Sequence, residues 1–162
     1  MSYSKSETNG TVYWYKDDAL HREDGPAVEC ADGYKAWYSD GKRHRLDGPA
    51  CEWSDGTKEW YVDGKRHRLD GPAIEYPNGY KEWHVDGELH RLDGPAEVKA
   101  NGTTIWWVKG KIHRLDGPAV EWPDGSKDWY VDGLEVEILT VFGYEPSVPL
   151  TEGEQMVLRL AT

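Results

Sequence analysis

Histidine, arginine and aspartate recur together at a fixed spacing, and these side chains could bind a metal or exchange protons. The phrase His-Arg-x-Asp-Gly-Pro-Ala begins every 23 residues, at His21, His44, His67, His90 and His113. Neighbouring histidines of such a ladder could share a metal ion. A zinc site, however, generally needs four ligands in a tetrahedron, and neither cysteine is in phase with these histidines. We therefore expect the phrase to satisfy its own loop, with the histidine, arginine and aspartate bonding one another and nearby backbone. A ladder that contacts a ligand is the second interpretation.

The aspartates of this phrase do not form a catalytic pair. Glycosidic chemistry requires one carboxyl group in an apolar pocket and another in a polar setting. The five aspartates instead occupy equivalent positions before Gly-Pro, where aspartate is a typical turn acceptor. The sequence has no Gly-x-Ser-x-Gly elbow, no phosphate-binding Gly-x-x-x-x-Gly-Lys and no cysteine with a phased histidine. We predict a protein that is not an enzyme, with no catalytic residue, no cofactor and no metal.

These phrases belong to a 23-residue repeat that occurs five times in full and once in part. The full repeats together span 21–135, and a half repeat at 8–20 matches the second half of the others. One tryptophan per repeat keeps the same period: Trp14, Trp37, Trp60, Trp83, Trp106 and Trp129. Equal spacing without insertions predicts repeats that each stack on their neighbours.

The two ends of the chain depart from the repeat. Residues 1–7 are expected to be a disordered tail. Residues 136–162 are expected to form a capping segment, with a strand at 136–142 and a short helix or strand at 155–160. Such a cap would cover the last edge of an open sheet.

Each repeat is interpreted as a β-hairpin. In the third, Ala73 to Tyr76 alternates, Pro77-Asn78-Gly79 forms a turn, and a second run follows. A three-residue loop with glycine in third place fits a type I turn followed by a left-handed glycine. That loop sets the register, and the expected cross-strand pairs are Glu29–Lys35, Glu52–Lys58, Glu75–Lys81, Val98–Thr104 and Glu121–Lys127. The second connection holds two Asp-Gly turns and has no room for a helix. The predicted fold is all-β: a single-domain antiparallel β-meander or solenoid of tandem hairpins, with eleven repeat-derived strands in one sheet.

Composition restricts the class of partner. The 162 residues include 30 acidic and 19 basic ones, and the net charge of -11 repels nucleic acid and anionic membranes. No stretch approaches the roughly 20 apolar residues of a membrane span, and the first residues lack the apolar core of a secretion signal. Cys30 and Cys51 occupy different positions in their repeats, which favours unpaired thiols in a reducing compartment. We predict a cytoplasmic protein with no nucleic-acid or membrane partner.

The period and the phrase Trp-Tyr-Val-Asp-Gly-Lys-Arg-His at 60–67 resemble MORN repeats, which are 23-residue β-hairpin units. The resemblance covers roughly residues 8–135 and departs after the histidine, where MORN units continue with Gly-x-Gly. It implies scaffolding, dimerisation or lipid contact, and the acidic charge disfavours the last. The His-Arg-x-Asp-Gly-Pro-Ala phrase also resembles repeats of uncharacterised proteins from large bacteriophages. That resemblance implies a phage accessory protein, acting in the host cytoplasm, that disarms a bacterial defence system by binding one of its components.

Function is expected at the positions where the repeats differ, since shared positions serve the fold. In the expected register the variable positions share one face, rich in aromatic rings. The predicted binding residues are Trp53, Tyr61, Tyr76, His84, Lys99, Trp107, Trp122 and Tyr130. The fourth repeat departs most from the pattern and is the expected centre of contact. The face could equally be the second packed side of the sheet, or be covered by the C-terminal segment.

Two functions follow from this face. The first is a non-catalytic interaction protein, a rigid acidic scaffold that binds a protein partner or forms a homo-oligomer through its sheet edges. The alternative is a small-ligand binder that stacks a nucleotide-like molecule on its rings, with Arg68 or Arg91 holding the phosphate. The sequence does not identify the partner.

Overall fold

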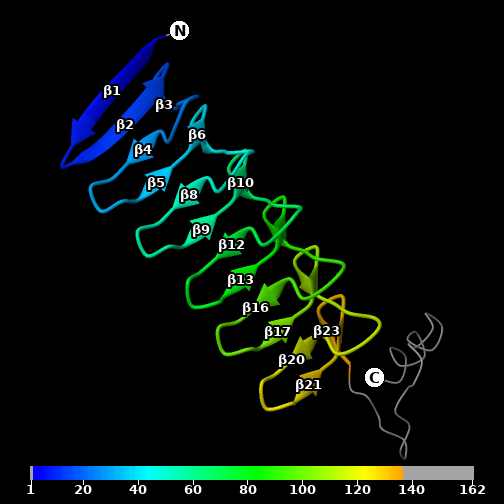
Figure 1. Cartoon of the computed structure of the whole chain (residues 1–162). Helices are drawn as coiled ribbons and strands as arrows, with labels where there is room; N and C mark the ends of the chain where they lie inside the picture. The colour runs from blue at the N-terminus through cyan, green and yellow to red at the C-terminus, as the bar shows by residue number, and fades with distance from the viewer. Residues whose placement is uncertain (1, 137–162) are drawn as a thin grey trace, which may run out of the picture. The chain divides into compact units, whose positions relative to one another are not determined.

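The computed structural model describes residues 2–136, and all regular structure in that range is β-strand (Figure 1). The fold is an antiparallel meander of tandem hairpins, which confirms the predicted fold class. The chain divides into two compact parts, an N-terminal part, Met1–Glu88, and a C-terminal part, Leu89–Thr162. The capping segment expected at 136–162 lies, apart from Val136, outside the described residues.

The N-terminal part contains one main sheet, with a strand order that follows the sequence. Its strands are β1 (Tyr3–Thr8), β2 (Thr11–Lys16), β4 (Val28–Glu29), β5 (Lys35–Ala36), β8 (Cys51–Glu52), β9 (Lys58–Glu59), β12 (Ile74–Glu75) and β13 (Lys81–Glu82). The two-residue strand β3 (Ala19–Leu20) also pairs with β2. Each repeat thus contributes two short neighbouring strands to the sheet.

The second hairpin of each repeat forms a separate two-stranded sheet. These are β6 (Tyr38–Ser39) with β7 (Lys42–Arg43), and β10 (Tyr61–Val62) with β11 (Lys65–Arg66). Strand β14 (His84–Val85) begins the third, and β15 (Glu88–Leu89) lies at the boundary of the two parts. The sequence predicted only turns in this connection, so these hairpins are strands additional to those expected in the main sheet.

The repeated tryptophan marks the point where the chain leaves the main sheet. The Trp60 backbone N–H donates to the carbonyl of Ala73 at 2.8 Å, which is a main-sheet contact. Its carbonyl accepts from the N–H of His67 at 3.1 Å, which belongs to the second hairpin. One residue thus serves both sheets, and the chain bends there because its two backbone groups face different partners.

The C-terminal part repeats this arrangement. Its main-sheet strands are β16 (Glu97–Val98), β17 (Thr104–Ile105), β20 (Val120–Glu121) and β21 (Lys127–Asp128). Its separate hairpins are β18 (Trp107–Val108) with β19 (Lys111–Ile112), and β22 (Tyr130–Val131) with β23 (Leu134–Glu135).

The register of the hairpins is confirmed in all five repeats. The observed pairs are Glu29–Lys35, Glu52–Lys58, Glu75–Lys81, Val98–Thr104 and Glu121–Lys127. The loop glycines have the left-handed conformation that this turn requires, as at Gly79, where φ is 88°. Local turn chemistry therefore determines the pairing of each hairpin.

The prediction of a disordered tail at 1–7 is wrong. Residues Tyr3–Thr8 form β1, which pairs with β2 along its whole length. A two-residue turn at Asn9-Gly10, with positive φ at both positions, connects the strands. The side chains of β1 are all exposed, so backbone pairing rather than burial holds this strand, and the hydrophobic pattern gave no sign of it.

The face of the main sheet that carries Val28, Ala36 and Cys51 is here called the inner face. These residues form a core cluster with Ala50 and Tyr61, and further rings pack against it. The opposite, outer face carries the paired glutamates and lysines of the repeats, together with the tryptophans. Both faces are thus occupied, one by packed side chains and one by charges and indole rings.

Candidate functional site

The arginine of each repeat forms a clamp around the His-Arg-x-Asp-Gly-Pro-Ala loop. The Arg68 guanidinium lies 4.0 Å from the centre of the Trp60 ring and donates from Nε to Asp70 at 2.9 Å. Its Nη1 donates to the Pro72 carbonyl and to Glu75 Oε1, each at 3.1 Å. Such planar donors match carboxylates well, and the stacked ring adds a cation–π contact. The loop is therefore fixed to the strand that precedes it and to the strand that follows.

The clamp recurs with nearly identical geometry. Arg22, Arg45 and Arg114 stack on Trp14, Trp37 and Trp106 at 4.0–4.1 Å. Arg91 donates to Asp93 at 2.8 Å and to the Pro95 carbonyl at 3.3 Å. These contacts agree with the interpretation that the phrase satisfies its own loop.

The clamp also sets the charge state of its aspartate. The hydrogen bond from Arg68, followed by its positive charge, lowers the pKa of Asp70, and Asp24, Asp47 and Asp93 are lowered in the same way. The Arg68 side chain is only 22% exposed. A phosphate bound by Arg68 would therefore compete with Asp70, Glu75 and the indole ring.

The histidines hold the Asp-Gly turns of the second hairpins. Nδ1 of His44 accepts a hydrogen bond from the N–H of Asp63 at 3.2 Å, nineteen residues later in the same repeat. The equivalent acceptors are His21, His67, His90 and His113, at 3.0–3.1 Å from Asp40, Asp86, Lys109 and Asp132. Nδ1 of His44 and of His67 also lies 3.0–3.1 Å from the carboxylate of the same turn aspartate, to which the other tautomer donates. The contact of each histidine is thus to the turn of the second hairpin. Within residues 2–136, no three metal-ligating side chains gather.

The residue after the clamp arginine is a leucine in four repeats, and in the second, third and fourth repeats it is the most exposed large apolar side chain. Leu46 is 80% exposed and Leu69 is 79% exposed in the N-terminal part. Leu92 and Leu115 occupy the same position in the C-terminal part, at 80% and 42%. The first repeat has Glu23 there, which is also largely exposed. Because a charged residue is accepted at this position, the fold does not require leucine.

These loops, here called the leucine loops, border shallow hollows with acidic rims. Leu46 and Leu69 line one hollow of about 530 Å³, together with Trp60, Asp47 and Asp70. Leu46 also lines a second hollow of about 570 Å³. Asp47 and Asp70 are almost fully exposed beside the leucines. An apolar group flanked by carboxylates is therefore presented at each loop.

The predicted binding residues do not lie on one accessible surface. Trp53, Tyr76 and Trp122 are 42%, 36% and 39% exposed, at the start of the hairpin loops. The Trp53 ring leans on Tyr34, with centroids 4.5 Å apart, and Tyr76 lies 5.4 Å from Tyr80. These rings partly pack on one another and leave one side to solvent.

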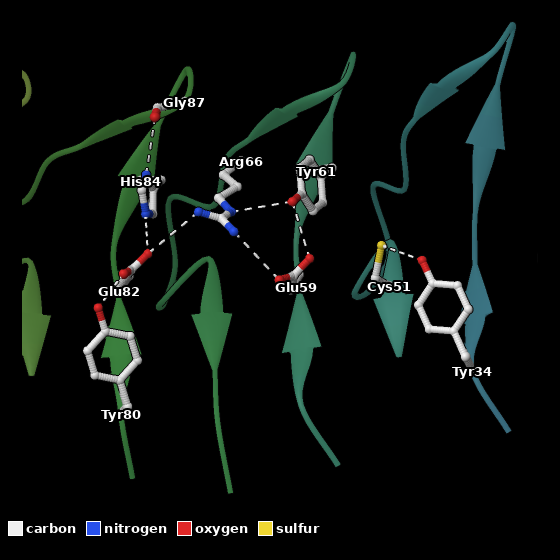
Figure 2. A network of polar contacts seen from close by, with 9 residues as sticks. All are labelled: Tyr34, Cys51, Glu59, Tyr61, Arg66, Tyr80, Glu82, His84 and Gly87. Atoms are coloured by element: carbon white, nitrogen blue, oxygen red, sulfur yellow. Dashed lines mark hydrogen bonds and ion pairs between the residues drawn. The ribbon is translucent and has the colours of Figure 1, made fainter. Parts of the chain in front are cut away.

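Tyr61 and His84, in contrast, are buried on the inner face, in a polar network (Figure 2). The network joins β9, β10, β11, β13 and β14, and it centres on Arg66. Arg66 is not one of the binding residues predicted from the positions where the repeats differ. Arg66 Nε donates to the Tyr61 hydroxyl at 3.3 Å, and its other nitrogens lie 3.7 Å from Glu59 and 3.9 Å from Glu82. The second hairpin therefore covers this part of the inner face, as the packed-side interpretation expected.

His84 contacts two acceptors in this network. Its Nε2 lies 2.7 Å from Glu82 Oε2, and its Nδ1 lies 3.3 Å from the Gly87 carbonyl. A ring nitrogen that carries a proton can donate to the acceptor that it faces. The positive charge of Arg66 lies between the carboxylates of Glu59 and Glu82. This fits the rule that buried charges are paired.

Burial and hydrogen bonding compete at Glu82. Burial alone would raise the pKa of this carboxyl group, but hydrogen bonds from His84 and Tyr80 and the charges of His84 and Arg66 outweigh it. The net result is a lowered pKa, so Glu82 stays ionised inside the protein. Nearby on the inner face, burial raises the pKa of the Cys51 thiol, which accepts a hydrogen bond from the Tyr34 hydroxyl at 3.7 Å. Cys51 is thus a packed thiol with little nucleophilic character.

The predicted residues of the C-terminal part are engaged in local contacts. Nε1 of Trp107 donates to Glu97 at 3.2 Å, and Nε1 of Trp122 donates to Asp128 at 2.8 Å. The Lys99 N–H donates to the Thr103 carbonyl in its hairpin loop. Tyr130 is half-buried, at the start of β22. Trp107 thus contacts the other hairpin of its repeat, whereas Trp122 and Lys99 make contacts within their own hairpins.

Comparison with known proteins adds no family. No family model matches the chain, and no curated protein is significantly similar to it. In the described part of the chain, no helix is long and apolar enough to cross a membrane.

Proposed function

We propose that this chain is a non-catalytic interaction protein that binds a protein partner through its leucine loops. The observation that supports this is the exposure of Leu46 and Leu69 at a position where the same fold accepts Glu23. Burying a leucine side chain releases about 1.5–3 kcal/mol relative to leaving it in water. A leucine that the fold does not bury can release that free energy on binding.

The surroundings of the leucines define the partner. Asp47 and Asp70 flank them and are exposed, and the chain carries a net charge of -11. Charge complementarity across an interface favours encounter and suppresses wrong partners. The partner proposed here presents apolar pockets surrounded by lysine or arginine.

Rigidity of the loops supports the same function. The clamp of Arg45 and that of Arg68 fix each leucine loop through a stacked ring, a carboxylate and a backbone carbonyl. A preorganised loop loses little conformational entropy on binding. The resemblance of the repeat to phage sequences adds the proposal that the partner belongs to a bacterial defence system.

The test replaces both leucines with the residue found in the first repeat. Leu46→Glu with Leu69→Glu should fold, since Glu23 occupies the same site, and should weaken partner binding at least about tenfold. Partners captured from host extract by the wild-type chain would be purified, and their affinities measured by calorimetry. Lys35→Gln with Lys58→Gln is the control, because it changes the net charge equally at exposed positions of the outer face.

Two outcomes would contradict the proposal. One is an unchanged affinity for the leucine variant. The other is a loss confined to Trp53→Ala with Tyr76→Ala, which would assign binding to the hairpin loops instead. The small-ligand alternative predicts a change in tryptophan fluorescence with nucleotides, and the engagement of Arg68 in its clamp argues against it.

A further inference from the structure

The first strand of the main sheet has an edge that no other described strand covers. Strand β1 (Tyr3–Thr8) pairs with β2 on one side (Figure 1), and all six of its side chains are exposed. It is also three times as long as the two-residue strands of the repeats. A long edge strand with unpaired backbone groups is a template for adding another strand.

The backbone contacts show which groups face outward. The N–H of Asp17 donates to the carbonyl of Ser2 at 2.9 Å, so Ser2 faces β2. Backbone groups alternate along an antiparallel strand, and Ser4, Ser6 and Thr8 therefore also face β2. The N–H and carbonyl groups of Tyr3, Lys5 and Glu7 point to the open edge.

The sequence of β1 is self-complementary in one register. In one antiparallel register the two-fold axis passes between Ser6 of one copy and Ser6 of the other, which is called pairing about Ser6. This register places Lys5 of each copy opposite Glu7 of the other, at hydrogen-bonded positions. Pairing about Lys5 or about Glu7 would place like charges opposite each other, which is destabilising. Pairing about Ser4 would leave Glu7 without a lysine. Lysine on an edge strand normally discourages pairing, but here a glutamate two residues away provides its counterpart.

We propose that the chain forms a two-fold symmetric homodimer by antiparallel pairing of β1 with β1 of a second copy, centred on Ser6. The same surface is used by both copies, so the assembly closes at two and the edge is consumed. The strand pair alone buries less area than a standard interface of about 1,600 Å². The dimer should therefore dissociate on dilution, independently of the leucine loops.

Charge exchange tests the register. Lys5→Glu puts a glutamate opposite Glu7, and Glu7→Lys puts a lysine opposite Lys5. Because each contact occurs twice, either variant should raise the dimer dissociation constant by about tenfold or more. The double variant restores opposite charges and should return within about threefold of wild type. Sedimentation velocity over a concentration series measures all four proteins.

A cysteine at the symmetry axis tests the geometry. At a non-hydrogen-bonded pair the Cα atoms are about 4.5 Å apart, within disulfide range. Ser6→Cys in a Cys30→Ser background should therefore form a covalent dimer under mild oxidation. In the matched control Ser4→Cys, the two cysteines would lie about 13 Å apart and should stay reduced.

The proposal is overturned if the wild-type chain stays monomeric at every concentration. It is also overturned if the single charge variants dimerise as wild type does, or if Ser4→Cys cross-links as readily as Ser6→Cys. The Leu46→Glu, Leu69→Glu variant should keep wild-type dimerisation, which separates this surface from the leucine loops.

Discussion

Glu82 is an ionised carboxylate held inside the N-terminal part by hydrogen bonds from His84 and Tyr80 and by an ion pair with Arg66. His84, Tyr80 and Arg66 all face it, and together they lower its pKa despite burial. In the unfolded chain the same carboxyl group titrates near its ordinary value of 4.5. Below that value the unfolded state binds a proton more readily than the native state does, so folding stability rises with pH in this window.

The first prediction is that Glu82 contributes to the loss of folding stability at acid pH. The contribution of Glu82 is complete above about pH 4.5 and is lost as the pH falls through its lowered folded-state value. Glu82→Gln should therefore flatten the decline in urea midpoint between pH 5 and pH 3, measured by tryptophan fluorescence. Glu88→Gln is the control for removing an exposed carboxylate nearby. A decline as steep in Glu82→Gln as in wild type would contradict the assignment.

At the scale of the element, the leucine loop and its clamp act as one structure. Gly71 lies under the guanidinium of Arg68, and a Cβ added at this glycine would approach Arg68 Cζ to 2.8 Å. Alanine at this position would therefore push the Arg68 guanidinium away from its stacked place. The backbone φ of Gly71 is not in the left-handed region. The need for glycine at this position therefore comes from the close approach of Arg68 and not from the backbone conformation.

The second prediction is that the effects of Arg68→Ala and Gly71→Ala are strongly non-additive. Arg68→Ala loses a cation–π contact and charge-assisted hydrogen bonds, about 2–3 kcal/mol of unfolding free energy. Gly71→Ala should cost a similar amount by displacing Arg68, but should be nearly neutral when Arg68 is already alanine. Urea unfolding of the wild type, the two single variants and the double variant measures the coupling free energy between positions 68 and 71.

Gly79→Ala provides the matched control for this cycle. Gly79 has a φ of 88° and no atom near its Cβ direction, so alanine is strained there whatever happens at Arg68. It should cost about 1 kcal/mol and add to the effect of Arg68→Ala. Additive behaviour of Gly71→Ala as well would show that the close approach does not matter.

At the scale of the molecule, stability should follow the number of repeats. Neighbouring repeats make the same clamp, the same histidine–turn contact and the same strand pairs. Removing one complete repeat should therefore leave contacts of the same kind at the new junction, as in other repeat proteins. Removing a different number of residues would place tryptophans opposite loops.

The third prediction is that deletion of 44–66 leaves a folded protein. Arg68 would then take the place of Arg45 over Trp37, and His67 the place of His44. The circular dichroism spectrum of this deletion variant should still show β-sheet. Its urea m-value should be lower than that of the wild type, because less surface is exposed on unfolding. Deletion of 44–60, which breaks the period, should unfold the N-terminal part. Equal behaviour of the two deletions would contradict a repeat-by-repeat fold.

Several features of the site escaped prediction for identifiable reasons. The leucines recur in four repeats, and the rule that shared positions serve the fold assigned them to structure, although Glu23 at the same place pointed elsewhere. Arg66 was not among the predicted residues, since nothing in its own sequence neighbourhood signals buried glutamates on neighbouring strands. Strand β1 has no apolar alternation, so only its Asn9-Gly10 turn hinted at a hairpin.

The sequence by itself determined the repeat, the turn types and the pairing of each hairpin. These depend on residues close together along the chain: a glycine able to adopt positive φ, and a glutamate six residues before its lysine. Only the tertiary structure decided which face of the sheet is packed, because both faces carry aromatic and charged residues. The bend at each tryptophan folds the second hairpin over one of them, which buries Tyr61 and His84 and leaves the leucine loops in water.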